Sequence, residues 1–129
     1  MKTLLDIKKL IIKNKYLVSA LVLITIYIVY FTTLSFLRYD NFYTGKYDLG
    51  NMDQVVWNTF HGRIFQTFLE NSETGKIASR ISSHADFILI LLAPFYSLWN
   101  NPKMLLLLQT VVLGLGGIFI YSTKKAFLN

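Results

Sequence analysis

One uncharged apolar run near the start of the chain limits its possible folds more than any other feature. From Tyr16 to Leu37 the chain runs for 22 residues without a charge. As an α-helix this run would extend about 33 Å, enough to cross the hydrocarbon core of a bilayer. It is longer than the apolar region of a signal peptide, and the residues at its end make a poor cleavage site. We therefore predict an uncleaved transmembrane helix over residues 16–37.

The composition is that of a membrane protein rather than of a water-soluble domain. The 129-residue chain is 53% hydrophobic and 16% charged, whereas soluble domains carry about 25% charged residues. It contains no cysteine, which excludes disulfides, thiolate metal sites and thiol catalysis. The length supports a single domain.

The basic residues flank the apolar runs. The net charge of +6 could suit a nucleic-acid partner, but its distribution argues against one. Lys124 and Lys125 follow the last apolar run, and five lysines precede the first: Lys2, Lys8, Lys9, Lys13 and Lys15. Such flanking charges favour a cytoplasmic side. We predict a multi-pass protein of the cytoplasmic (plasma) membrane, with residues 1–15 in the cytoplasm and no nucleic-acid partner.

Two further apolar segments follow, and they leave the topology open. Residues 87–99 form a short segment that contains Pro94, and residues 104–121 form a good span. If both segments cross the membrane, the basic end at 122–129 lies outside the cell. If the short segment only dips into the membrane, this basic end lies inside. The fold argument slightly favours two crossings, and the charge argument favours one. Three glycines in the last span could allow close helix contact: Gly114, Gly116 and Gly117.

The loop at 38–86 is predicted to lie outside the cell and to contain an amphipathic surface helix near 49–61. At about 100° per residue, four apolar side chains fall within one stripe: Leu49, Met52, Val56 and Phe60. Asn51, Gln54, Asn58 and His61 fall on the opposite side. Gly62 is a natural helix stop. The fold class is therefore all-α integral membrane, with two to three membrane-embedded helices and a helical extracytoplasmic loop.

Five residues of this loop are candidates for a functional site. Asp48 fits the N-cap of the surface helix or, alternatively, a catalytic role. Asp53 falls at the edge of the apolar stripe, where a carboxylate needs a partner, an aqueous cavity or a shifted pKa. Arg38 suits an interfacial anchor or a lipid-phosphate contact. Arg80 and His84 stand where the chain re-enters the membrane, as a polar collar or as ligands for phosphate.

The nature of any cofactor stays open at this point. Aspartate and histidine suit hard or intermediate divalent metal ions, so Asp48 and Asp53 are the ligands we would expect if a metal binds. The spacing does not require one. Nucleotide-binding, zinc-protease and serine-hydrolase signatures are all absent from the sequence.

Three motifs resemble those of a known membrane protein family. Residues 47–58 read Y-D-L-G-N-M-D-Q-V-V-W-N, followed by Gly62. This is similar to the pattern F-D-L-G-x-x-D-Q-x-x-W-N of the family called domain of unknown function 2079. That family's second motif, His-Phe-x-Pro with a leucine-rich run and A-P-x-Y, is matched by residues 84–96, although the His-Phe pair is interrupted and its proline is missing. Residues 105–117 match the third element, so the resemblance covers about residues 38–121.

The resemblance implies a function as well as a fold. The family is similar in layout to C-type glycosyltransferases (GT-C), polytopic membrane enzymes that use polyprenyl-phosphate-linked sugars. It implies that Asp48 matches their catalytic aspartate, with Asp53 as a supporting acid or metal ligand. Arg38, Arg80 and His84 would then contact the donor phosphate. Because such enzymes have many more spans, we expect the chain to be an N-terminal module that is inactive in isolation.

Two other functions are compatible with the residues. A small non-catalytic membrane protein could use the loop helix to bind a partner or the membrane surface. A transporter-like fragment could place Asp53 and Asp86 on an ion path, although neither lies deep within a span.

Overall fold

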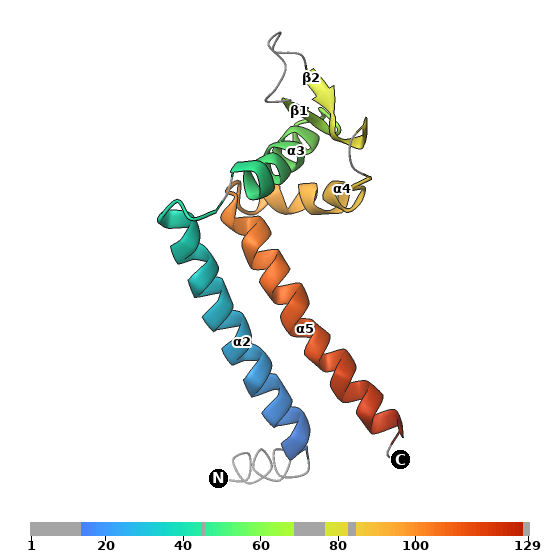
Figure 1. The fold of residues 1–129 in the computed structure, drawn as a ribbon. Helices are drawn as coiled ribbons and strands as arrows, with labels where there is room; N and C mark the ends of the chain where they lie inside the picture. The colour runs from blue at the N-terminus through green and yellow to red at the C-terminus, as the bar shows by residue number, and fades with distance from the viewer. Residues whose placement is uncertain (1–13, 45, 69–76, 83–84, 128–129) are drawn as a thin grey trace. The chain divides into compact units, whose positions relative to one another are not determined.

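The structure, a computed structural model, describes residues 14–44, 46–68, 77–82 and 85–127 (Figure 1). It divides into two compact units. The helix-pair unit comprises residues 1–34 and 108–129, and the loop unit comprises residues 35–107. Most of the predicted cytoplasmic segment 1–15, together with His84, lies outside the described residues.

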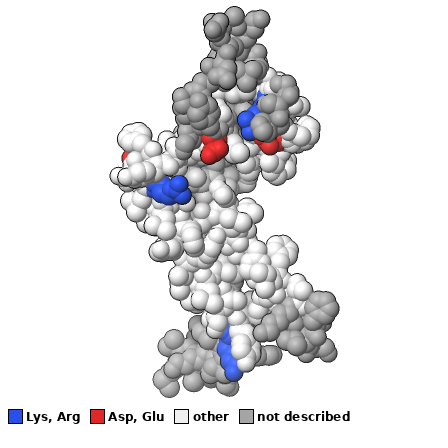
Figure 2. Space-filling model, in the orientation of Figure 1, with Lys and Arg blue, Asp and Glu red and all other residues white. Residues whose placement is uncertain are grey.

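Two long helices correspond to the predicted spans at 16–37 and 104–121. Helix α2 covers Lys15–Asp40 and helix α5 covers Lys103–Phe127. Lys15–Asp40 and Lys103–Thr123 are each long and apolar enough to cross a membrane. Figure 2 shows an uncharged surface along these helices between their charged ends. The two long helices were therefore predicted correctly, with ends that differ by a few residues.

Within the helix-pair unit, α2 and α5 approach each other closely at two glycines. A Cβ atom added at Gly114 would lie 2.6 Å from Ile28 Cγ1, and one added at Gly117 would lie 3.1 Å from Ile24. The later glycine meets the earlier isoleucine, so the helices are antiparallel here. A Cβ at Gly116 would meet nothing within 4 Å. Two of the three glycines therefore serve close packing, as expected of small residues between membrane helices.

The loop unit has its own core, built around helix α3 (Asn51–Phe60). Helix α3 packs against the short α-helix α4 (Ile88–Leu92), the 3-10 helix η3 (Ala93–Ser97) and the strand β1 (Gln66–Phe68). The buried hydrophobic side chains come from all parts of the unit: Val55, Val56, Phe65, Leu89, Ala93, Tyr96, Met104 and Leu105. From the sequence, the segments that form this core were predicted to be a surface helix and a membrane segment.

Turns and a small ribbon complete the loop unit. Strand β1 pairs antiparallel with β2 (Ile77–Ser79), with Thr67 opposite Ala78, and the 3-10 turn η2 (Arg80–Ser82) follows. This ribbon was not predicted. Gly62 ends α3 with a positive φ of 80°, while the Arg63 N–H donates to the Asn58 carbonyl oxygen at 2.8 Å. Gly62 is thus the predicted helix stop.

The predicted apolar stripe of the loop helix is wrong in part. Met52 and Phe60 are about 40% exposed, whereas Val55, Val56 and Asn58 are buried. The buried face therefore includes Val56 of the predicted stripe together with Asn58, which was expected on the polar side. Asn58 can be buried because its side chain donates to the Gln66 carbonyl oxygen at 2.9 Å and accepts from Arg63 Nε at 3.0 Å.

Asp48 does not cap α3. A five-residue π-helix, η1 (Lys46–Gly50), precedes α3, so Gly50 occupies the N-cap position and no side chain caps the helix. Asp48 lies exposed in this π-helix. The N-cap interpretation failed because it assumed that the helix begins directly after Asp48.

The segment at 87–99 does not form a spanning helix. Its apolar helical part covers only ten residues, Ile88–Ser97, about 15–20 Å against a hydrocarbon core of about 30 Å. Pro94, which cannot donate a backbone hydrogen bond, lies at the start of η3, where the α-helical geometry ends. The length of this helical part therefore favours the alternative in which the segment does not cross.

Candidate functional site

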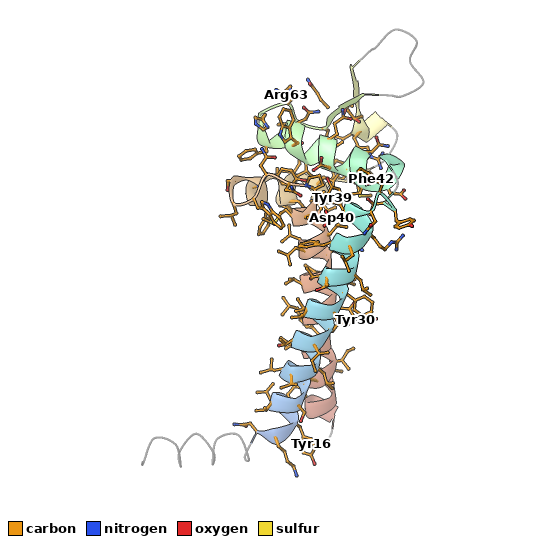
Figure 3. The ribbon with its side chains drawn as sticks, turned by 90° about the vertical axis from the view of Figure 1, so that its left-hand side faces the viewer. Tyr16, Tyr30, Tyr39, Asp40, Phe42 and Arg63 are labelled. Atoms are coloured by element: carbon orange, nitrogen blue, oxygen red, sulfur yellow. The ribbon has the colours of Figure 1, made fainter. Side chains whose placement is uncertain are left out.

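The loop unit contains a cleft where α2 ends. It encloses about 420 Å³ and is lined by the last residues of α2, the turn after it, η1, α3 and the turn before α5: Tyr39, Asp40, Phe42, Thr44, Leu49, Gly50, Asp53 and Pro102. Figure 3 labels Tyr39, Asp40 and Phe42 at this end of α2. The cleft is therefore walled by aromatic and apolar groups and carries two carboxylates.

Asp53 is the half-buried carboxylate of this cleft. Tyr96 Oη donates a short hydrogen bond to Asp53 Oδ1. Burial raises the pKa of Asp53 above its ordinary value of 3.8, while the hydrogen bond from Tyr96 opposes that shift. Burial and the neighbouring carboxylate raise the pKa of Tyr96, which keeps its hydroxyl protonated as the donor. Asp53 thus has a partner, lines a cavity and has a shifted pKa, where its sequence position predicted at least one of the three.

Asp40 forms an ion pair at the same cleft. Lys103 Nζ lies 2.7 Å from Asp40 Oδ1 and 2.9 Å from Oδ2. The same ammonium group lies 5.3 Å from the ring centroid of Phe36 and 5.7 Å from that of Tyr39. These contacts join the last turns of α2 to the first turn of α5 within the loop unit. Asp40 therefore has a cationic partner, whereas the partner of Asp53 is a neutral hydroxyl.

Three other predicted site residues, Arg38, Asp48 and Arg80, do not line this cleft. Asp48 and Arg38 are exposed, and neither lines it. Arg80 Nε donates to Asp86 Oδ2 at 2.9 Å, so this guanidinium already has a carboxylate partner. Among the described residues, no group of three or more histidines, aspartates and glutamates could hold a metal ion.

Two residues of the site were not predicted from the sequence. Tyr96 was not singled out, although it ends the A-P-x-Y motif at residues 93–96 and its position in that motif was a usable signal. Lys103 was not singled out, because its carboxylate partner is 63 positions away and no local pattern joins them.

The architecture indicates a class of protein: a predicted membrane protein with two candidate spans and, between them in the sequence, a folded unit. A family profile described as predicted membrane protein (DUF2079) matches residues 38–129. The chain belongs to this family, as its motifs indicated. No curated protein and no solved structure matches the chain.

Proposed function

We propose that the chain is the N-terminal module of a membrane glycosyltransferase of the GT-C type. In this proposal the enzyme transfers a sugar from a polyprenyl-phosphate donor to an acceptor hydroxyl at the outer face of the cytoplasmic membrane. The observation that carries the proposal is Asp53, a carboxylate with a raised pKa and a tyrosine partner, in a cleft where a candidate span ends. The resemblance of the motifs to this layout supports the class of reaction, although it assigns the catalytic aspartate to Asp48 rather than to Asp53.

Asp53 suits the role of general base better than Asp48. A base works best when its pKa approaches the operating pH, and burial moves the pKa of Asp53 in that direction. The Tyr96 hydroxyl holds the carboxylate in place. Asp48 is exposed outside the cleft and would act as a supporting acid.

The reaction balances with these groups. The acceptor O–H gives its proton to the Asp53 carboxylate while the acceptor oxygen forms a bond to the anomeric carbon. The bond between that carbon and the phosphate oxygen breaks, and the polyprenyl phosphate leaves with the electron pair. Cations near the leaving phosphate would favour this step. Arg38, exposed on the last turn of α2, is our first candidate, with Arg80 and His84 next.

The test compares Asp53→Asn with Asp48→Asn in the full-length protein. Transfer of a radiolabelled hexose from polyprenyl phosphate would be measured in membranes. Loss of a general base lowers rates by about 10²–10⁴-fold, so Asp53→Asn should lose transfer while membrane insertion is unchanged. Asp48→Asn should retain more activity. Full transfer by Asp53→Asn would refute the proposal.

One observation favours a second, non-catalytic function for the loop helix. Met52, Trp57 and Phe60 are each about 40% exposed on α3, and such side chains suit contact with a partner or a membrane surface. This function predicts that the two amide variants behave like the wild type. It also predicts that a charge at Met52 or Phe60 abolishes binding, so the same panel of variants separates the two functions.

A further inference from the structure

Phe42 combines two unfavourable features at one position. Its side chain is 94% exposed, and its backbone has a positive φ of 58°. An exposed phenyl ring loses the benefit of burial. A left-handed backbone is strained for any residue with a side chain, so glycine is the usual occupant of such a position.

The turn around Phe42 shows why the left-handed conformation is needed. The Phe42 N–H donates to the Tyr39 carbonyl oxygen at 3.0 Å, and the Tyr43 N–H donates to that of Arg38 at 2.9 Å. These two bonds end α2 as a Schellman motif, with Phe42 at the position that glycine usually takes. The same turn holds the ring in place beside the end of the helix.

Phe65 provides a contrast within the same unit. It has nearly the same φ, 57°, but its side chain is only 2% exposed. Its ring lies 6.2 Å from that of Phe87, and its N–H donates to Thr59 Oγ1 at 3.1 Å. Burial therefore offsets the strain at Phe65, whereas at Phe42 the protein supplies no comparable burial.

The residues around Phe42 indicate which environment its exposed ring contacts. The ring stands two residues beyond α2, a candidate membrane span, so the chain holds it within about 7 Å of the helix end. Tyr43 beside it is 75% exposed. Arg38, on the last turn of α2, is also exposed and can reach a lipid phosphate. Aromatic rings next to a cation at the end of a span are typical of the membrane interface.

We infer that Phe42 is inserted into the bilayer interface and that the cleft it lines opens at the level of the lipid headgroups. Tyr39 and Thr44, on either side of the turn, line the same cleft. A ligand of the cleft would then enter it along the membrane surface. This inference concerns the position of the cleft and holds whether or not Asp53 is a catalytic base.

A fluorescence experiment tests the position of Phe42. The sequence contains no cysteine, so Phe42→Cys can carry a single environment-sensitive fluorophore on the full chain in phosphatidylcholine–phosphatidylglycerol vesicles. Ile64→Cys is the matched control, because Ile64 is also an exposed apolar residue of the loop unit. The measured quantity is the ratio of two quenching efficiencies of the fluorophore: that by a nitroxide in the upper acyl chain of the lipid, and that by iodide in the aqueous phase. We expect a ratio several-fold higher at position 42, and equal or reversed ratios would overturn the inference.

A second variant separates insertion from folding. Phe42→Gly removes the ring but suits the left-handed backbone, so the turn and the helical circular dichroism should be retained. With the fluorophore at Tyr43→Cys, this change should lower the lipid-to-iodide quenching ratio several-fold, because the inserted ring is gone. An unchanged ratio, with unchanged circular dichroism, would show that Phe42 does not hold this turn in the membrane.

Discussion

Asp53 and Tyr96 join two segments that lie 43 positions apart in the chain. The ring of Tyr96 is almost fully buried, so its hydroxyl reaches Asp53 from a fixed direction. The raised pKa of Asp53 means that the folded state favours its protonated form. The contribution of Asp53 to the free energy of unfolding is therefore present below about pH 4 and is lost as the pH rises through the raised pKa.

Replacing Tyr96 with Phe should destabilise the loop unit more at neutral than at acidic pH. At neutral pH the variant loses a hydrogen bond to an ionised carboxylate, a loss of about 1.5–3 kcal/mol. Below the pKa of Asp53 the lost bond joins two neutral groups and contributes about 0.5–1.5 kcal/mol. Thermal unfolding in detergent at several pH values measures this difference. Tyr43→Phe is the control, because Tyr43 is exposed.

The sequence predicted the environment of Asp53 but not its partner. Helical periodicity placed Asp53 at the edge of an apolar stripe, and that alone required a cavity or a shifted pKa. The partner could not be found in this way, because periodicity describes one element and Tyr96 belongs to another. The same limit applies to Asp40 and Lys103. A flat pH dependence of the Tyr96→Phe effect would contradict the role given to this hydrogen bond.

At the scale of the elements, length and charge predicted the two long helices, since a run of about 20 uncharged apolar residues has few other stable forms. The π-helix at Lys46–Gly50 and the ribbon between β1 and β2 were missed. Both depend on how α3 packs on η3 and β1 rather than on local propensity. For the same reason the buried face of α3 is centred on Val55 and Val56, of which only Val56 belongs to the predicted stripe.

Gly114→Ala should weaken the packing of α2 on α5, whereas Gly116→Ala should not. The new methyl group at Gly114 would lie 2.6 Å from Ile28 Cγ1, and Cγ1 is not the free end of that side chain. Overpacking of this kind costs about 1–3 kcal/mol, more than the gain of up to about 1 kcal/mol from replacing a helical glycine. Unfolding by sodium dodecyl sulfate from mixed micelles measures both variants. Equal stability of the two would show that α2 and α5 do not pack at Gly114.

At the scale of the whole molecule, the two candidate spans decide the topology. Because the helical part of 88–97 is too short to cross a bilayer, we predict that the chain crosses once through α2 and once through α5. The two ends of the described chain then lie on one side of the membrane, and the segment between the spans lies on the other. This arrangement removes the conflict raised by Lys124 and Lys125, which come to the same side as the basic N-terminal residues.

The positive-inside rule predicts on which side of the membrane each segment lies, and this orientation can be measured. We predict that Ser79→Cys, in the exposed part of the loop unit, reacts with a membrane-impermeant maleimide in intact cells. Ser122→Cys, exposed near the end of α5, should react only after the cells are permeabilised. Labelling of both positions in intact cells would indicate a third crossing and restore the alternative with two crossings after the loop. The reverse pattern would place the Asp53 cleft in the cytoplasm, where donors and acceptors of another kind would have to be considered.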